Sequence, residues 1–512
     1  MNGQRSGGTP GQGRSDQGRS GQSGGQSRSG QGAAGQGKSG QSKSGQGRDG
    51  TGSAGAQGRG GGRPTGRRRP PRPARDEARN AAYDLMRAVD ERDAYANLLM
   101  PTLLRQRRIS GRDAALATEL AYGTLRGLGT YDEIIAACSD RAPEHVDPPL
   151  LDAIRLGVHQ LLKTRIPPHA AVSATIDLVR LRVGAGPSRY ANAVLRKVAG
   201  RTLEEWLAIV APPREQDAVG NLAVSYSHPA WIVGALRDAL GGDVEETAAL
   251  LEADNERPRV ALVARPGRCS VDELLEAGGE RARYSPYGVY LPEGDPGSLR
   301  AVGEARAAVQ DEASQLVALA LTRVPLDHDG RWLDMCAGPG GKAGLLDALA
   351  VQGGGHLLAA DAQYHRARLV WSTTKDAEVV TADGTRPPWR AGAFDRVMLD
   401  APCTGLGALR RRPEARWRRD PRSIPELTSL QRRLLDSALE SVRPGGVVAY
   451  VTCSPHLAET RDVVEGVAER VDVLDAREFL PEVPSLGDGP YVQFWPHRHG
   501  TDAMFLALLR RR

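Results

Sequence analysis

Short apolar runs alternate with helical stretches along the chain after Arg331, and this alternation restricts the fold more than any other feature. The runs are rich in Val, Leu and Ala, whereas stretches between them, such as "SLQRRLLDSALESV" (429–442), have the periodicity of amphipathic helices. Strands that alternate with helices form a parallel sheet that is covered on both faces. The sequence therefore predicts a doubly wound α/β domain over residues 326–512.

Carboxylates follow the first three apolar runs, at the edge where such sheets bind ligands. Asp334 precedes a Gly-rich turn, where it would attract an ammonium group and repel the phosphate of a dinucleotide. Asp361 lies about twenty residues beyond that turn, where an acid can bind ribose hydroxyls, and Asp383 would lie near an adenine. An isolated Asp is more often a helix cap, but three in succession favour S-adenosylmethionine (SAM) over NAD.

Two further runs end in cysteines at the same edge. "FDRVMLDAPC" (394–403) delivers Asp400 and Cys403, and "VVAYVTC" (447–453) delivers Cys453. In the usual doubly wound order the fourth and fifth strands are neighbours, about 5 Å apart, so both sulfur atoms can reach one pocket. Carbon 5 of a pyrimidine is a weak nucleophile until a thiolate adds to carbon 6. A second thiol could then assist product release, and Asp400 could protonate or hydrogen-bond N3; a lone thiol such as Cys336 is more often a small apolar group.

A basic segment, "ALRRRPEARWRRDPRS" (408–423), begins beside Cys403. Arginines can neutralise phosphates, and an interleaved Trp can stack on an extruded base. A solvated run of charges is the alternative, but the position beside a reactive thiol favours RNA binding. The predicted RNA contacts are Arg410, Arg411, Arg412, Arg416, Trp417 and Arg418.

Three other regions precede the α/β domain. Residues 1–75 contain 14 Lys and Arg against two Asp and almost no apolar side chains, so we expect a disordered tail that is either an RNA tether or a solubilising segment. Residues 76–201 have helical periodicity throughout and predict an all-helical domain. Residues 202–325 mix short helices with short strands and predict a small α+β module.

Composition limits the other possibilities. A chain of 512 residues predicts roughly three domains, and no apolar run approaches the roughly 20 residues that span a bilayer. Without an N-terminal apolar signal, a cytoplasmic protein with no membrane association is expected. Five scattered cysteines predict free thiols and no metal site. A monomer is expected.

Several motifs resemble one family, the RsmB/Sun group of RNA cytosine-C5 methyltransferases. The motifs are "LDMCAGPGGK" (333–342), "DAPCTGLGALRRRPEARWRR" (400–419) and "YVTCSP" (450–455). "ELAYGTLRGLGTYDEII" (119–135) and "PPHAAVSATIDLVR" (167–180) are similar to the NusB-like RNA-binding domain of that group, and "VQDEASQLVA" (309–318) to the entry into its catalytic domain. The resemblance covers nearly everything after residue 75 and implies a Rossmann-like SAM-binding fold.

The resemblance also implies roles for individual residues. Cys453 would be the nucleophile, as is typical of RNA rather than DNA methyltransferases, and Cys403 would promote product release. The motif reads "AGPGGKAG" where an Ala and a Thr are common in the family, and "HLAET" (456–460) replaces a more acidic sequence. These departures leave substrate details open. The implied cofactor contacts are Cys336, Ala337, Gly338, Pro339, Gly340, Gly341, Lys342, Asp361, Asp383 and Asp400.

The sequence thus predicts a SAM-dependent RNA cytosine-C5 methyltransferase that acts on small-subunit (16S) ribosomal RNA. Methylation of transfer RNA is one alternative. The other is a NusB-like assembly or transcription factor whose methyltransferase fold is inert, although such a scaffold would have no need of Asp400, Cys403 and Cys453.

Overall fold

The computed structural model describes residues 76–292 and 294–512. The predicted disordered tail, residues 1–75, lies outside the described residues. Within the described ranges, no helix combines the length and the apolar character that crossing a bilayer requires.

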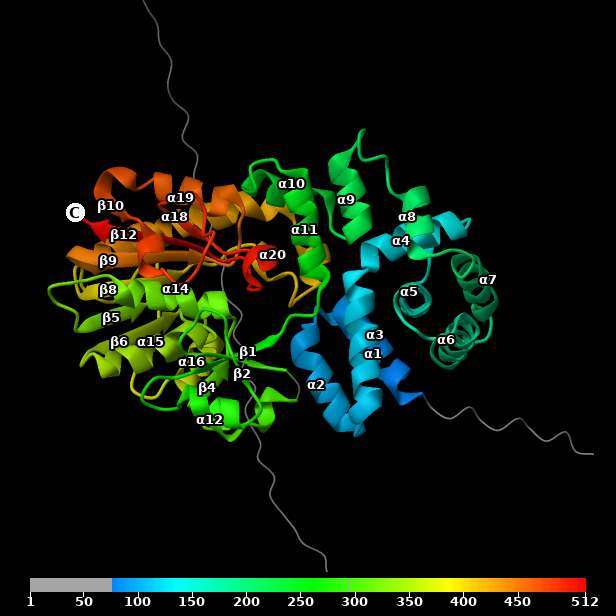
Figure 1. Ribbon diagram of the computed structural model, residues 1–512, viewed down its shortest axis with the longest axis horizontal. Coiled ribbons are helices and arrows are strands. Elements are labelled where there is room, and N and C mark those ends of the chain that lie inside the picture. Colours follow the sequence, from blue (N-terminus) through cyan, green and yellow to red (C-terminus); the bar gives the residue numbers. More distant parts are fainter. Residues whose placement is uncertain (1–75, 293) are drawn as a thin grey trace, which may run out of the picture. The chain divides into compact units, whose positions relative to one another are not determined.

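The first region of the described chain is a bundle of helices (Figure 1). Apolar residues at helical spacing form its core: Leu151, Ile154 and Val158 of α5 are all buried. The last helix begins with a capping box, in which Thr202 and Glu205 each bind the other's backbone N–H. The helices are α1 (Glu77–Arg92), α2 (Ala96–Arg107), α3 (Gly111–Arg126), α4 (Leu128–Cys138), α5 (Pro148–Lys163), α6 (Pro168–Arg182), α7 (Ser188–Val198) and α8 (Leu203–Val210).

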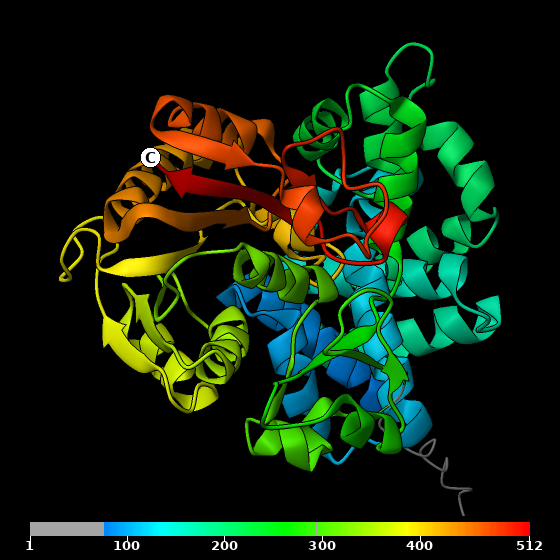
Figure 2. The same ribbon diagram turned by 60° about the vertical axis from the view of Figure 1, so that its left-hand side comes forward.

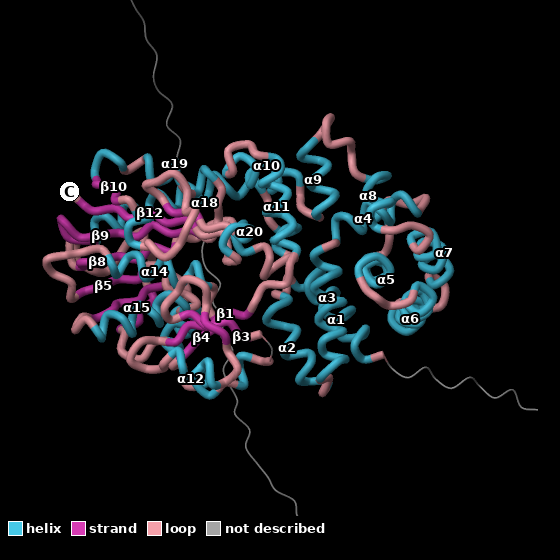
Figure 3. The backbone as a smooth tube through the Cα atoms, in the orientation of Figure 1, coloured by secondary structure: helices cyan, strands magenta, loops and turns pink. Residues whose placement is uncertain are grey.

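The middle region combines five helices with a small antiparallel sheet (Figure 3), and the strand order of that sheet is β2-β3-β1-β4. Its helices are α9 (Ala218–Tyr226), α10 (Ala230–Ala239), α11 (Val244–Asn255), α12 (Val271–Glu276) and α13 (Arg300–Gly303). Its strands are β1 (Val260–Ala264), β2 (Glu280–Arg281), β3 (Gly288–Leu291) and β4 (Ala307–Val309). The predicted boundaries at 201 and 325 remain predictions, and Trp206 of α8 packs in the helical core.

The large sheet has the order β7-β6-β5-β8-β9-β12-β10, and β11 pairs with β12. Strands β5 to β9 are parallel, whereas β12 runs antiparallel between β9 and β10 (Figure 2). The strands are β5 (Arg331–Asp334), β6 (His356–Asp361), β7 (Glu378–Thr381), β8 (Phe394–Asp400), β9 (Val442–Thr452), β10 (Val471–Leu474), β11 (Val492–Gln493) and β12 (Phe505–Arg511). The helices are α14 (Glu312–Arg323), α15 (Gly341–Gln352), α16 (Tyr364–Thr373), α17 (Ala415–Arg418), α18 (Ile424–Ser441), α19 (Arg461–Glu465) and α20 (Pro496–His499).

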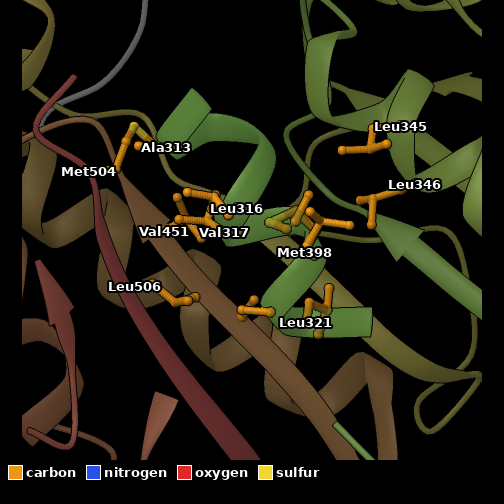
Figure 4. Close-up of a cluster of buried hydrophobic side chains, with 14 of the residues drawn as sticks. Ala313, Leu316, Val317, Leu321, Leu345, Leu346, Met398, Val451, Met504 and Leu506 are labelled. Carbon is orange, nitrogen blue, oxygen red and sulfur yellow. The ribbon is translucent and has the colours of Figure 1, made fainter. Parts of the chain in front are cut away.

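Helices cover both faces of this sheet, because successive strand residues point to opposite sides. On one face α14 and α15 pack against the sheet, and Figure 4 shows Leu316 and Val317 of α14 beside Val451 and Leu506 of the strands. On the other face Leu435 of α18 belongs to a separate apolar cluster with β8 and β9. The prediction of a helical domain followed by a doubly wound α/β sheet is confirmed.

Candidate active site

The candidate site lies where the strand order reverses, between β5 and β8. Open α/β sheets bind ligands at such a switch point, beyond the carboxyl ends of the strands. Asp334 ends β5 and Asp400 ends β8. Asp361 ends β6, next to β5. The register of the sheet therefore brings three predicted acids to one edge.

The Gly-rich turn after β5 approaches its neighbours too closely for larger side chains. Gly340 has φ of 110°, and a Cβ there would lie 2.0 Å from the Oγ1 atom of Thr373. A Cβ on Gly338 would lie 2.5 Å from Oδ2 of Asp361. The Gly338 N–H instead donates to that oxygen at 3.1 Å. Two glycines thus let the backbone pass close to the end of β6.

Asp334 is a buried carboxyl group whose two oxygens have no hydrogen-bond partner at normal geometry within the described chain. Burial, and after it the nearby Asp400, raises the pKa of Asp334 to about 8. A buried acid without a donor is costly. Asp334 is therefore suited to bind a ligand with a positively charged hydrogen-bond donor.

The other two predicted cofactor acids are already engaged by the chain. Asp361 accepts from the Gln363 N–H at 2.9 Å and forms an ion pair with Arg366 at 3.2 Å. Asp383 is exposed beyond β7 and accepts from the backbone N–H and hydroxyl of Thr385, and these hydrogen bonds lower its pKa. A carboxylate can accept further donors, so both could also bind ligand hydroxyl or amino groups.

Cys403 and Cys453 meet in this site. Their sulfur atoms are 3.4 Å apart, and both residues are half-buried. The loop after β8 continues along the end of β9, because the Gly407 N–H donates to the carbonyl of Cys453 at 2.8 Å. A Cβ on Gly407 would lie 1.9 Å from the carbonyl oxygen of Ala503, so glycine is required for this approach. The predicted convergence of two thiols is present.

The two thiols are not equivalent. The hydrogen bond between the two sulfur atoms lowers the pKa of Cys453, and the cation of Lys342 lowers it further. The same hydrogen bond, followed by burial, raises the pKa of Cys403 well above its usual value. A thiolate is the nucleophilic form of cysteine, and the direction of these shifts favours the thiolate at Cys453. The third thiol, Cys336, has its pKa raised by burial and then by Asp334, so it stays protonated.

Lys342, a predicted cofactor contact, also contacts Asp400. It lies in the first turn of α15, and its Nζ contacts Oδ2 of Asp400 at 2.9 Å. Burial acts to lower the pKa of Lys342, but Asp400 outweighs it and the net pKa is raised. The lysine therefore remains a cation that orients Asp400 beside the thiols.

The basic segment 408–423 contributes far less exposed charge than expected. Arg410 and Arg411 both form ion pairs with Asp311 and Asp502. Arg416 is fully buried at 0% exposure and donates to Asn255 and to backbone carbonyl groups. The guanidinium group of Arg418 donates to the carbonyls of Val89, Asp93 and Ala94.

The expectation of an exposed patch is corrected here, because four of its arginines connect distant parts of the chain. Arg412 stays exposed while stacking on Tyr95, and Trp417 is 39% exposed. Arg419, which the predicted contacts omitted, forms no ion pair within residues 76–292 and 294–512. A Cβ built on Gly405 would lie 3.4 Å from its Nη2 and 4.0 Å from the Cys453 sulfur.

Comparisons with known proteins identify the family of this chain. Residues 320–510 match the model of the family described as 16S rRNA methyltransferase RsmB/F, and residues 76–200 match the NusB family. The chain is 52% identical to Rv1407 of Mycobacterium tuberculosis (strain ATCC 25618 / H37Rv), which is named as a methyltransferase, over 87% of this chain and 98% of that one. It is 30% identical to ribosomal RNA small subunit methyltransferase B of Klebsiella pneumoniae (strain 342), over 84% and 97%. This chain belongs to the RsmB/F family.

The solved structure of PH0851 resembles this RsmB/F family member with a TM-score of 0.70 at 23% identity, over 86% of this chain and 99% of that one. At that identity the likeness supports the fold. Membership of the family makes the protein a SAM-dependent methyltransferase. The predictions of family, enzyme class and cofactor are therefore confirmed.

The site of this RsmB/F methyltransferase suits SAM, since Asp334 could receive the ammonium group. SAM binding at about pH 6.5 should release about one proton, because Asp334 is protonated there in the free protein and a nearby cation would ionise it. Calorimetry in two buffers of different ionisation enthalpy measures this release. Asp361→Asn, a matched removal of a carboxylate, should weaken binding but keep the release. Equal heats in the two buffers, or release that persists in Asp334→Asn, would contradict the role of Asp334.

Proposed function

We propose that this RsmB/F methyltransferase methylates carbon 5 of a cytosine in RNA, with 16S ribosomal RNA as the substrate, through a covalent cysteine adduct. The observation that carries the proposal is the pair of half-buried thiols, 3.4 Å apart, beside Asp400 at the ligand-binding edge of the sheet. Simple transfer to an oxygen or nitrogen atom needs no thiol. The rRNA substrate is favoured by the names of the family model and of the Klebsiella relative.

In the proposed reaction, the Cys453 thiolate adds to carbon 6 of the ring, and the electron pair of the 5,6 double bond makes carbon 5 nucleophilic. Asp400, which Lys342 contacts at 2.9 Å, protonates N3 of the ring or forms a hydrogen bond with it. SAM supplies the methyl group to carbon 5. Loss of the carbon 5 proton to a base restores the double bond as the C6–S bond breaks and the Cys453 thiolate leaves. Cys403 assists this last step.

The proposed cofactor contacts are the turn from Cys336 to Lys342 together with Asp361, Asp383 and Asp400. The turn supplies backbone groups at close range, because Gly338 and Gly340 have no room for side chains. Asp334 joins this set as the partner of the ammonium group. Lys342 contributes through Asp400, as the ion pair between them indicates.

The proposed RNA contacts are reduced to the exposed members of the basic segment. Arg412 and Trp417 retain exposed surface for a phosphate and a base, respectively. Arg419 is added, because its guanidinium group lies near Gly405 at the thiol pair, where a phosphate of the target nucleotide would pass. We propose that the enzyme acts as a monomer in the cytoplasm, on ribosomal RNA.

Purified enzyme incubated with labelled SAM should methylate small-subunit ribosomal RNA at one cytosine, which bisulfite sequencing identifies. The same cytosine should lose its mark in a deletion strain and regain it when the wild-type gene is restored. A Cys453→Ala gene serves as the matched control and should not restore it. A mark lost from transfer RNA instead would favour the first alternative, and unchanged maps of both RNAs would reject the proposed function.

A further inference from the structure

Glu459 is a fully buried carboxylate at 0% exposure, six residues beyond Cys453. It ends the short 3-10 turn Leu457–Glu459. Within residues 76–292 and 294–512, no Lys, Arg or His side chain forms an ion pair with it. A buried carboxylate without a cation is costly even when it is hydrogen-bonded. A buried charge of this kind beside a reactive group is a candidate for a functional role.

The hydrogen bonds of Glu459 lead to the loop that carries the other thiol. Its Oε1 accepts from the N–H of Thr404 at 2.8 Å, and Oε2 accepts from the Thr404 hydroxyl at 2.5 Å. Gln431 donates to the same carboxylate at 3.2 Å and to the carbonyl of Pro402 at 2.8 Å. Glu459 thus holds Thr404 on one side of Cys403, and its partner Gln431 holds Pro402 on the other.

The loop of Cys453 is connected to the same network of hydrogen bonds. The Thr404 hydroxyl lies 3.0 Å from the hydroxyl of Ser454, the residue after Cys453. The hydroxyl of Tyr450, on β9, donates to the backbone carbonyl of Glu459 at 2.8 Å. The network therefore fixes the two loops relative to each other, and with them the distance between the sulfur atoms.

Two identical thiols in contact need an external field to decide which one keeps the proton. A cation and an anion provide that field, since Lys342 acts on Cys453 and Glu459 acts on Cys403. Three other charges lie around the pair. Asp400, at the end of β8, raises the pKa of both thiols, and Asp502, before β12, raises that of Cys453 and so opposes Lys342. Arg419 lies beside Gly405.

We infer that Glu459 is a positioning residue that keeps Cys403 as the hydrogen-bond donor and Cys453 as the acceptor in the thiol pair. This inference rests on the proposed function, in which Cys453 attacks the ring. Glu459 acts through the loop of Cys403 and through its negative charge, without touching the substrate. It thereby gives two chemically identical groups separate tasks.

The test is competitive alkylation of the free protein by iodoacetamide across a pH series, with mass spectrometry to identify which cysteine reacts. In the wild type, Cys453 should react first and at lower pH. In Glu459→Gln, which keeps the shape but removes the charge, the preference for Cys453 should fall at least about fivefold. Glu465→Gln, on the exposed side of α19, is the matched control and should keep it.

Two more variants separate positioning from mere stability. Glu459→Asp keeps the charge and should retain most of the preference. Thr404→Val removes the two hydrogen bonds of the hydroxyl, with Glu459 and Ser454, so it should lower the melting temperature but also retain the preference. A folded Glu459→Gln protein with wild-type preference would overturn the inference and leave the proposed function standing. A wild type whose two thiols react equally would instead overturn the assignment of Cys453 as nucleophile.

Discussion

Replacing Cys453 with alanine should lower methyl transfer by at least about 1,000-fold and remove covalent complexes with RNA, because no other described thiol can take its place. The pKa of Cys403 is raised, and burial raises the pKa of Cys336 so that it stays protonated beside Asp334. Transfer of labelled methyl groups from SAM to RNA measures the first effect. Denaturing gels measure the second.

Cys403→Ala should have the opposite effect on the complexes. It leaves the attacking sulfur in place but removes its neighbour at 3.4 Å, so protein attached to RNA should accumulate while turnover falls. Cys138→Ala, a buried thiol in the helical domain, is the control and should change neither quantity. Stable complexes in Cys453→Ala, rather than in Cys403→Ala, would reverse the two roles.

Lys342→Met should reduce the rate of methyl transfer by about 100-fold at neutral pH and move the acidic limb of the rate profile to higher pH. The thiolate of Cys453 is the reactive form, so activity rises as pH passes the pKa of that thiol. Lys342 lowers this pKa and orients Asp400 at 2.9 Å. Removing the cation raises the pKa, and more alkaline conditions are then needed for the same thiolate fraction.

Single-turnover rates of Lys342→Met across a pH series check this result, together with the pH dependence of Cys453 alkylation. Lys375→Met removes an exposed lysine and should leave both profiles unchanged. A rate loss without a shift of the acidic limb would mean that Lys342 acts only through Asp400, and an unaffected rate would remove it from the site.

The edge of the sheet could be predicted from sequence because the chemistry there follows strand ends. Asp334, Asp361 and Asp400 end parallel strands, and parallel strands deliver their carboxyl ends to one side. The meeting of Cys403 and Cys453 follows from the same rule once β8 and β9 are neighbours. These positions depend on local pattern and on topology alone.

The arginines could not be predicted in this way, because their partners are distant in the chain. Arg416 binds Asn255, and Arg410 binds Asp311 and Asp502. A run of positive charge has the same sequence whether it faces solvent or fills a buried network. Glu459 could not be predicted for a similar reason. It is the only acidic residue in "HLAET", and nothing in that stretch indicates that Thr404 and Gln431 will hydrogen-bond to it.

The buried guanidinium of Arg416 has a further consequence. The segment that begins at the catalytic cysteine loop ends among the carbonyl groups of Arg126 at the end of α3 and of Ser227 and Asp254 beside α9 and α11. The loop that carries Cys403 and a buried link to the preceding helices thus belong to one continuous piece of polypeptide. Separating the α/β domain from the preceding helices would leave the buried guanidinium group of Arg416 without these acceptors.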